Sequence, residues 1–196
     1  MAEENKLANV APLGLMGFGM TTVLLNIHNA GIIPLGGMIL AMGIFYGGFA
    51  QLIAGWWEIK QNNTFAAVAF SSYGLFWLTF VGIRIIPAVV EGIEAPGHTA
   101  TAAYLAMWGL FTGWMFLSTL KLNRALQVVF STLTILFFLL ATAYAIGPDS
   151  DAGQIVYTIA GIEGIFCGFS AIYTALAEVT NEYYDKTIFP IGPVEE

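Results

Sequence analysis

Residues 125–146 read ALQVVFSTLTILFFLLATAYAI, a stretch without a single charged side chain. Arg124 precedes this stretch and Gly147-Pro148-Asp149 follows it. A helix needs about 20 largely apolar residues to cross the hydrocarbon core of a bilayer. The length, the absence of charge and the flanking residues therefore predict a membrane-spanning helix over residues 125–146.

The composition of the whole chain agrees with this segment. Of the 196 residues, 58% are hydrophobic and only 10% are charged, whereas soluble domains carry about 25% charged residues. A net charge of −7 with six basic residues argues against nucleic-acid binding. The one cysteine, Cys167, leaves no internal disulfide and no Cys-based metal site, and no cofactor is expected. We expect an integral membrane protein.

Runs of similar length and polarity predict six transmembrane helices. No signal-peptide cleavage pattern follows the first run, so we expect that run to be retained as a span. The predicted spans cover residues 12–28, 34–57, 65–88, 101–119, 125–146 and 153–177. The connections are short, so the predicted organisation is a tail over residues 1–11, a six-helix domain over 12–178 and a second tail over 179–196.

The basic residues predict the orientation. An even number of spans places both tails on one side of the membrane, which then receives all the basic residues except Arg84. These are Lys6, Lys60, Lys121, Arg124 and Lys186. Because cytoplasmic loops are enriched in Lys and Arg, we expect both termini in the cytoplasm and a location in the cytoplasmic (inner) membrane.

A short pattern, G-[I/L]-F-x-G, occurs in every second span. It reads GIFYG at 43–47, GLFTG at 109–113 and GIFCG at 164–168. Glycines at positions i and i+4 share one helix face and allow another helix to approach closely. Three copies running the same way suggest three parallel helical hairpins around a pore, a recurring transporter architecture. Chance stays an alternative, because Gly, Ile and Phe are common in this chain.

If the hairpins are repeats, their first helices correspond as well. Phe18, Tyr73 and Leu133 then lie at similar depth in the three hairpins. Such residues either converge on a common axis as a narrow apolar neck or serve as ordinary packing residues. Spacing alone favours packing.

Residues 9–18, NVAPLGLMGF, are similar to the signature N-P-[A/V]-P-[L/F]-G-L-x-[G/S/A]-F of the acetate uptake transporter family, in its bacterial succinate–acetate permease branch. The resemblance continues in MILAMGIFYGG at 38–48, SYGLFWLT at 72–79, TLK at 119–121 and EVTNE at 178–182. It covers essentially the whole chain. The departure is Val10, which stands where the family has its first proline.

This resemblance implies a homo-oligomer, a hexamer, in which each six-helix protomer has its own pore in the membrane lipid. It implies uptake of acetate and succinate, generally with protons, and it places the family's apolar constriction at Phe18, Tyr73 and Leu133. A passive anion channel without obligatory proton coupling stays an alternative, as does an ammonium or neutral-solute channel. An enzyme is not expected, because no cluster of His, Asp or Glu has metal or acid–base spacing.

A small carboxylate is mostly ionised near pH 7, and an uncompensated anion is very costly in hydrocarbon. The start of the first helix offers unpaired N–H groups that favour an anion, although the same motif also fits a simple helix cap. Amide and hydroxyl groups within the spans add hydrogen-bond partners. Together the candidates for substrate contact or pore lining are Asn9, Pro12, Leu13, Gly14, Leu15, Thr22, Asn26 and Gln51.

Two charged residues need separate explanations. Glu163 lies about ten residues into the sixth span, where an ionised carboxylate costs at least ~2.5 kcal/mol. It is either a proton-carrying group or a neutral side chain hydrogen-bonded between helices. Because it lies outside the family signature, it is a secondary candidate. Arg84, at the outer end of the third span, either draws anions to the mouth or pairs with Glu91 or a lipid headgroup.

Overall fold

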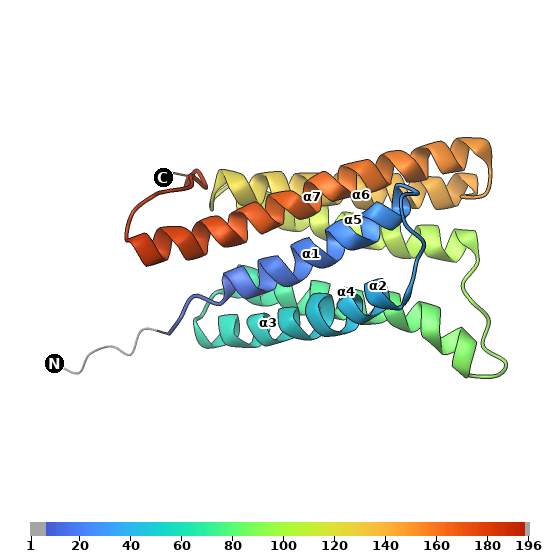
Figure 1. Ribbon diagram of the computed structural model, residues 1–196, viewed down its shortest axis with the longest axis horizontal. Helices are drawn as coiled ribbons and strands as arrows, with labels where there is room; N and C mark the ends of the chain where they lie inside the picture. Colours follow the sequence, from blue (N-terminus) through green and yellow to red (C-terminus); the bar gives the residue numbers. More distant parts are fainter. Residues whose placement is uncertain (1–6, 195–196) are drawn as a thin grey trace.

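The structure is a computed structural model that describes residues 7–194. Six helical rods account for most of the described residues (Figure 1). They are α1 (Ala11–Asn29), the continuous rod of α2 (Gly37–Met42), η1 (Gly43–Ala50) and α3 (Gln51–Lys60), α4 (Thr64–Val89), α5 (His98–Thr119), α6 (Arg124–Ile146) and α7 (Asp151–Tyr184). Within residues 7–194 the β-structure is one isolated bridge between Asn123 and Pro193. The predicted all-α fold with six rods is confirmed.

Five of the rods are long and apolar enough to cross a membrane, namely Gly37–Lys60, Thr64–Val89, His98–Thr119, Arg124–Ile146 and Asp151–Tyr184. Helix α1 does not meet that criterion, because it carries polar residues such as Thr21, Thr22 and Asn26. These three side chains are at most 3% exposed, and 12 of the 19 residues of α1 are buried. Neighbouring helices rather than lipid therefore cover the polar positions of α1.

The last rod is longer than the sequence predicts. Helix α7 begins after Ser150, whose hydroxyl accepts a hydrogen bond from the Gly153 amide, and it ends at Tyr184, where Asp185 adopts a left-handed conformation. At 1.5 Å per residue, its 34 residues span about 51 Å, which exceeds the ~30 Å hydrocarbon core. The predicted end at residue 177 is thus the end of the apolar stretch, not of the helix.

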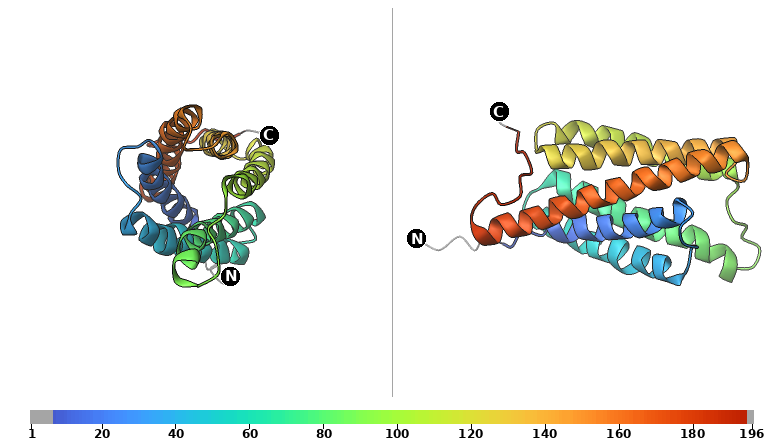
Figure 2. Two further views of the ribbon diagram at one scale, coloured as in Figure 1. Left: turned by 90° about the vertical axis from the view of Figure 1, so that its right-hand side faces the viewer. Right: turned by 45° about the horizontal axis from the view of Figure 1, so that its top comes forward.

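Seen end-on, the rods surround a common axis (Figure 2). Going round the ring, α1 packs on α7, α7 on α6, α6 on α5, and α3 on α4, while α1 also contacts η1 and α3. The seam between α4 and α5 is the sparsest. Between hairpins, α3 packs on α4, α5 on α6 and α7 on α1, so each time the second helix of one hairpin packs on the first helix of another. This repeated pairing supports three related hairpins.

The glycine motifs form these contacts. In each case the second helix of one hairpin presents its glycines to the first helix of the next hairpin. Gly43 and Gly47 face Val81 and Trp77 of α4, Gly109 and Gly113 face Phe138 and Thr134 of α6, and Gly164 and Gly168 face Asn26 and Val23 of α1. The motif therefore packs helices inside the protomer, in a closed cycle of three.

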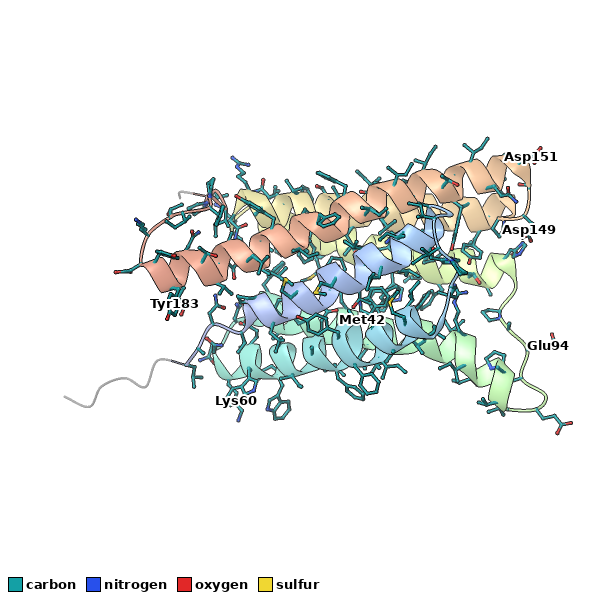
Figure 3. All side chains as sticks on the ribbon, in the orientation of Figure 1. Met42, Lys60, Glu94, Asp149, Asp151 and Tyr183 are labelled. Carbon is teal, nitrogen blue, oxygen red and sulfur yellow. The ribbon has the colours of Figure 1, made fainter. Side chains whose placement is uncertain are left out.

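Both described ends of the chain lie at the same end of the bundle, here called the terminal end, and the α4–α5 and α6–α7 loops lie at the opposite end, the loop end (Figure 1). Lys60 and Tyr183 lie at the terminal end, and Glu94, Asp149 and Asp151 lie at the loop end (Figure 3). Residues 1–6 and 195–196 of the predicted tails, including Lys6, lie outside the described residues.

The glycine packing leads to a stability prediction. A Cβ atom at Gly47 would lie 2.7 Å from Cγ of Trp77, so Gly47→Leu must displace an indole that is 2% exposed. Overpacking of this kind typically costs about 1–3 kcal/mol. We expect Gly47→Leu to lower the unfolding temperature in detergent by several degrees. Gly37→Leu is the control, because nothing lies within 4 Å of a Cβ there; equal unfolding temperatures for the two variants would contradict this packing role.

Candidate functional site

Three cavities follow one another along the axis of the bundle. The terminal cavity, about 460 Å³, lies at the terminal end and includes Asn9, Asn63, Asn123 and Glu178 in its lining. The neck cavity, about 20 Å³, is lined by Phe18, Tyr73, Leu133 and Gln51 among others. The loop-end cavity, about 90 Å³, includes Asn29, Phe80, Arg84 and Tyr157 in its lining.

The same three helices line all three cavities in register. Each of α1, α4 and α6 contributes successive residues from the terminal end to the loop end. The order is Leu15, Phe18 and Leu25 on α1, Ala66, Tyr73 and Phe76 on α4, and Leu126, Leu133 and Leu140 on α6. These are the first helices of the three hairpins. The repeated packing therefore creates a single axial series of cavities.

The neck cavity is narrow and apolar. Phe18, Tyr73 and Leu133 are 6%, 3% and 3% exposed, and the ring centroids of Phe18 and Tyr73 are 5.9 Å apart. The Tyr73 hydroxyl donates to Oγ1 of Thr112 on α5, at 2.9 Å, so the polar end of the tyrosine is engaged. The sequence allowed two roles for these three residues, an apolar neck or ordinary packing. The structure brings them together around one cavity. The neck cavity, with a volume of about 20 Å³, has room for about one water molecule.

Gln51 is a polar exception in the neck cavity. Its side chain is 1% exposed, and neither Oε1 nor Nε2 has a hydrogen-bond partner among the described residues. Leaving a buried polar group unpaired costs about 1–3 kcal/mol, and such groups call for a specific explanation. A water or a passing ligand in the neck cavity provides one. Gln51 was among the residues selected from the sequence.

A π-helix, which the sequence does not predict, precedes Gln51. Element η1 (Gly43–Ala50) contains three glycines and ends directly before Gln51. Gly17 of α1 packs directly on this segment, because a Cβ at Gly17 would lie 2.5 Å from the Tyr46 carbonyl oxygen and 3.5 Å from Cγ of Gln51. Short π-helical segments are frequent at functional sites. Here the segment coincides with the first copy of the glycine motif.

The terminal cavity receives the N-termini of three helices. Asn9, Asn63 and Asn123 all line it, one at the start of each hairpin. Their side-chain oxygens accept hydrogen bonds from the amides of Ala11, Ala66 and Leu126, at 3.1, 3.2 and 2.8 Å. Helix N-termini carry partial positive charge, so their convergence favours an anion in this cavity.

Only Asn9 of these three asparagines was selected from the sequence. Asn63 and Asn123 each come directly before the first helix of a hairpin, and comparing the three hairpin starts would have found them. Glu178 also lines the terminal cavity and accepts a hydrogen bond from Nδ2 of Asn9, at 3.4 Å. It occurs in the motif at 178–182, which the sequence analysis used only for the resemblance.

The remaining residues of the N-terminal motif have different surroundings. Leu15 lines both the terminal and the neck cavity. Pro12 and Gly14 are buried, and a Cβ at Gly14 would lie 2.5 Å from the Phe70 ring. Gly14 therefore allows α4 to approach, which leaves no open backbone for a ligand. Leu13 is 38% exposed and lies outside the linings of the three cavities.

Thr22 and Asn26 belong to the contact between α1 and α7. The Asn26 amide donates to the Thr22 carbonyl at 2.9 Å, and its oxygen accepts from Nδ2 of Asn29 at 2.9 Å. Asn26 packs on Gly164 of α7. The Thr22 hydroxyl is buried and has no partner among the described residues. Both side chains lie outside the linings of the three cavities.

Glu163 also lies off the axial series. Its carboxylate oxygens are buried and, within residues 7–194, have no hydrogen-bond partner. One turn further along α7, Cys167 contacts the Val129 carbonyl of α6 at 3.8 Å. The hydrogen-bonded alternative considered from the sequence thus finds no partner group in the described part of the chain. In the same part, no cluster of three or more His, Cys, Asp or Glu side chains offers a metal site.

Comparison with known proteins agrees with this architecture. Residues 1–194 match the GPR1/FUN34/yaaH family. The chain is 54% identical to the succinate-acetate/proton symporter SatP of Escherichia coli K12, over 96% of this chain and 97% of that one. It is 36% identical to acetate permease A of Emericella nidulans, over 97% of this chain and 67% of that one.

A solved structure resembles the whole bundle. The structure of the bacterial acetate channel SatP superposes with a TM-score of 0.91 at 53% identity, covering 95% of this chain and all of that one. The family match extends over nearly the entire sequence, and it confirms the resemblance based on residues 9–18 and the later motifs. The chain belongs to the GPR1/FUN34/yaaH family.

Proposed function

We propose that this protein transports acetate and succinate across the cytoplasmic membrane along the axial series of cavities. The observation that carries the proposal is the apolar neck of Phe18, Tyr73 and Leu133 between two wider cavities. It occurs in a chain 54% identical to a succinate-acetate/proton symporter. The excess of Lys and Arg at the terminal end supports a cytoplasmic location for that end.

The terminal cavity supplies an anion site on the cytoplasmic side. Three helix N-termini point their partial positive charge toward it, and its volume of about 460 Å³ accommodates a small hydrated carboxylate. The amides of Asn9, Asn63 and Asn123 lie in the same lining. Of the motif residues, Leu15 belongs to the lining of this cavity. Leu13 is exposed outside it, and the buried residues Pro12, Gly14, Thr22 and Asn26 act through helix packing.

The neck favours the neutral acid over the anion. An ionised carboxylate entering a cavity of this size must lose its water without gaining a countercharge, which is very costly. A protonated carboxyl group has one donor and one acceptor, and the Gln51 amide in the neck offers one acceptor and one donor, both unpaired. A carboxylate can only accept hydrogen bonds. Gln51 therefore matches the protonated form.

In this mechanism the proton travels on the acid, and the transport couples to protons without a dedicated carrier. Glu163 is the alternative carrier. Its buried oxygens support that alternative, but its position outside the three cavity linings favours the first version. A passive channel for anions would need a polar neck, which the described residues do not provide.

We also propose a homo-oligomer, a hexamer, of protomers that each contain a complete pathway in the lipid. The glycine faces are occupied inside the protomer, so the contacts between protomers must use other surfaces. Large apolar side chains lie on the outside of the bundle, including Phe45, Trp114 and Phe166, which are 67%, 76% and 58% exposed. Such side chains suit contact with lipid or with a second protomer.

The transport mechanism is tested by flux of labelled acetate into proteoliposomes at several external pH values. The neutral fraction of the acid rises about tenfold for each pH unit lost above a pKa near 4 to 5. We expect uptake to rise steeply as the external pH falls from about 7 to 5, and Glu163→Gln to keep this profile. A flat profile in Glu163→Gln would identify Glu163 as the carrier. Methylammonium is the control solute, and faster flux of methylammonium than of acetate would reject the carboxylate pathway.

The neck is tested by the size of acids that pass. Leu133→Ala and Phe18→Ala remove side chains that are 3% and 6% exposed and should widen the neck. We expect both variants to admit larger monocarboxylic acids, with acetate flux retained. Leu13→Ala, in the same helix as Phe18 but outside the cavity linings, is the matched control. If the range of acids stays unchanged in both neck variants, the constriction lies elsewhere.

The oligomer is tested by native mass spectrometry in mild detergent. The chain is 21.1 kDa, so we expect a complex of six times that mass. Detection of monomers alone would contradict the hexamer, and it would leave the pathway within each protomer unaffected. Gly47→Leu is informative here because its effect should fall on protomer stability rather than on the subunit number.

A further inference from the structure

The lining of the loop-end cavity includes a cationic side chain that has no role in the transport mechanism proposed above. Arg84, near the end of α4, lines this cavity together with Phe80 of the same helix. The centre of its guanidinium lies 4.8 Å from the centroid of the Phe80 ring. Arginine stacks favourably on aromatic faces. The stacking therefore restrains the guanidinium at the cavity.

Within residues 7–194 the charge of Arg84 has no salt-bridge partner. The ion pair found within residues 7–194 joins His98 and Asp149, at 3.5 Å. Neither Glu91 nor Glu94, on the loop after α4, lies within salt-bridge distance of Arg84. The pairing with Glu91 considered from the sequence is therefore wrong for the described residues.

Three other polar residues of the cavity, Asn29, Tyr104 and Tyr157, already have hydrogen-bond partners in the protein. The Tyr157 hydroxyl donates to Oδ1 of Asn29 at 2.8 Å, and Nδ2 of Asn29 donates to Asn26 at 2.9 Å. The Tyr104 hydroxyl donates to the Phe76 carbonyl at 3.5 Å. Besides the neutral Tyr144 hydroxyl, these bonds leave the guanidinium of Arg84 as the charged donor available to a ligand. Most of the remaining lining is apolar, which suits the methyl or methylene part of a small acid.

Arg84 places a positive charge at an end of the bundle that also carries several carboxylates. The loop end carries Glu94, Asp149 and Asp151 (Figure 3), and this negative field repels a carboxylate that approaches the pathway. A guanidinium binds a carboxylate through two parallel hydrogen bonds, and one positive charge at the cavity offsets the repulsion locally. Arg84 follows Tyr73 by 11 residues, which corresponds to about 16 Å along α4. The site is thus separate from the neck.

We propose that Arg84 and the loop-end cavity form a capture site for the ionised carboxylate of the transported acid. This inference rests on the proposed function for the identity of the acid. The acid binds here as an anion, and it takes up a proton before it enters the neck. At the other end of the pathway, the terminal cavity holds the anion by helix N-termini, so the two ends use different chemistry for the same group.

Binding at Arg84 can be measured without transport, by chemical modification of arginine side chains. The chain has two arginines, Arg84 and Arg124, and the second serves as an internal control. Arg124 lies at the opposite end, donates to Gln127 at 2.8 Å and does not line the terminal cavity. The protein in phosphatidylcholine proteoliposomes is treated with phenylglyoxal, and the modified arginines are quantified by peptide mass spectrometry. We expect acetate and succinate, but not chloride, to slow the modification of Arg84 and to leave that of Arg124 unchanged. Equal effects on the two arginines would overturn the site.

A flux measurement gives an independent result. Charge-assisted pairing at a partly exposed site is worth about a tenfold change in affinity. We expect Arg84→Gln to raise the half-saturating acetate concentration on the loop side by about five- to tenfold, with the maximal rate retained, and Arg84→Lys to have a smaller effect. Arg124→Gln, which removes the same charge from the other end, should change neither quantity. An unchanged half-saturating concentration in Arg84→Gln would overturn the site.

A lipid phosphate is the other source of anions for the same guanidinium. The protection assay is therefore repeated with phosphatidylglycerol in the vesicles and no acetate. Protection by phosphatidylglycerol alone, without protection by acetate, would assign Arg84 to a headgroup and overturn the capture site. Protection of Arg84 by acetate in a protein without acetate flux would instead reject the proposed function and leave the site standing.

Discussion

The close approach of glycine-bearing helices to their neighbours is the contact on which the bundle depends. At Gly47, Gly109 and Gly164 the second helix of a hairpin meets a side chain of the next hairpin with little space for a Cβ atom. Between lipid-facing helices hydrophobic burial is a weak driving force, so association relies on such van der Waals packing. Because the three contacts form a cycle, the hairpins close into a ring.

Closing the ring in this way determines what lies on the axis. The first helices of the hairpins, α1, α4 and α6, point large residues inward, and Phe18, Tyr73 and Leu133 meet at one level. The Tyr73 hydroxyl donates to Thr112 on α5, and of its two neighbours in the ring α4 packs less closely on α5 than on α3. This hydrogen bond links the two helices across the sparse seam of the ring and directs the polar end of Tyr73 away from the neck.

The electrostatic environment changes along the axis from polar ends to an apolar middle, which suits the passage of a weak acid. The terminal cavity combines three helix N-termini and three asparagines with the Glu178 carboxyl group, which accepts a hydrogen bond from Asn9. The loop-end cavity contains Arg84. Between them the neck offers apolar walls and the one amide of Gln51. In the proposed mechanism the ends favour the ionised acid and the middle favours the neutral acid, which assigns protonation and dehydration to the boundaries of the neck.

The sequence by itself determined the membrane class, six rods near their correct positions, the hairpin repeat and the family, because apolar length, glycine spacing and a ten-residue signature are local properties of the chain. It also selected Phe18, Tyr73, Leu133 and Gln51. Only the tertiary structure decided between packing and convergence for the first three, since that depends on how far each helix is rotated about its own axis. Tertiary packing likewise placed Asn26 and Glu163 outside the three cavity linings and brought Asn63 and Asn123 into the lining of the terminal cavity. The π-helix before Gln51 and the unpaired charge of Arg84 likewise depend on contacts between distant segments, which spacing along the chain does not encode.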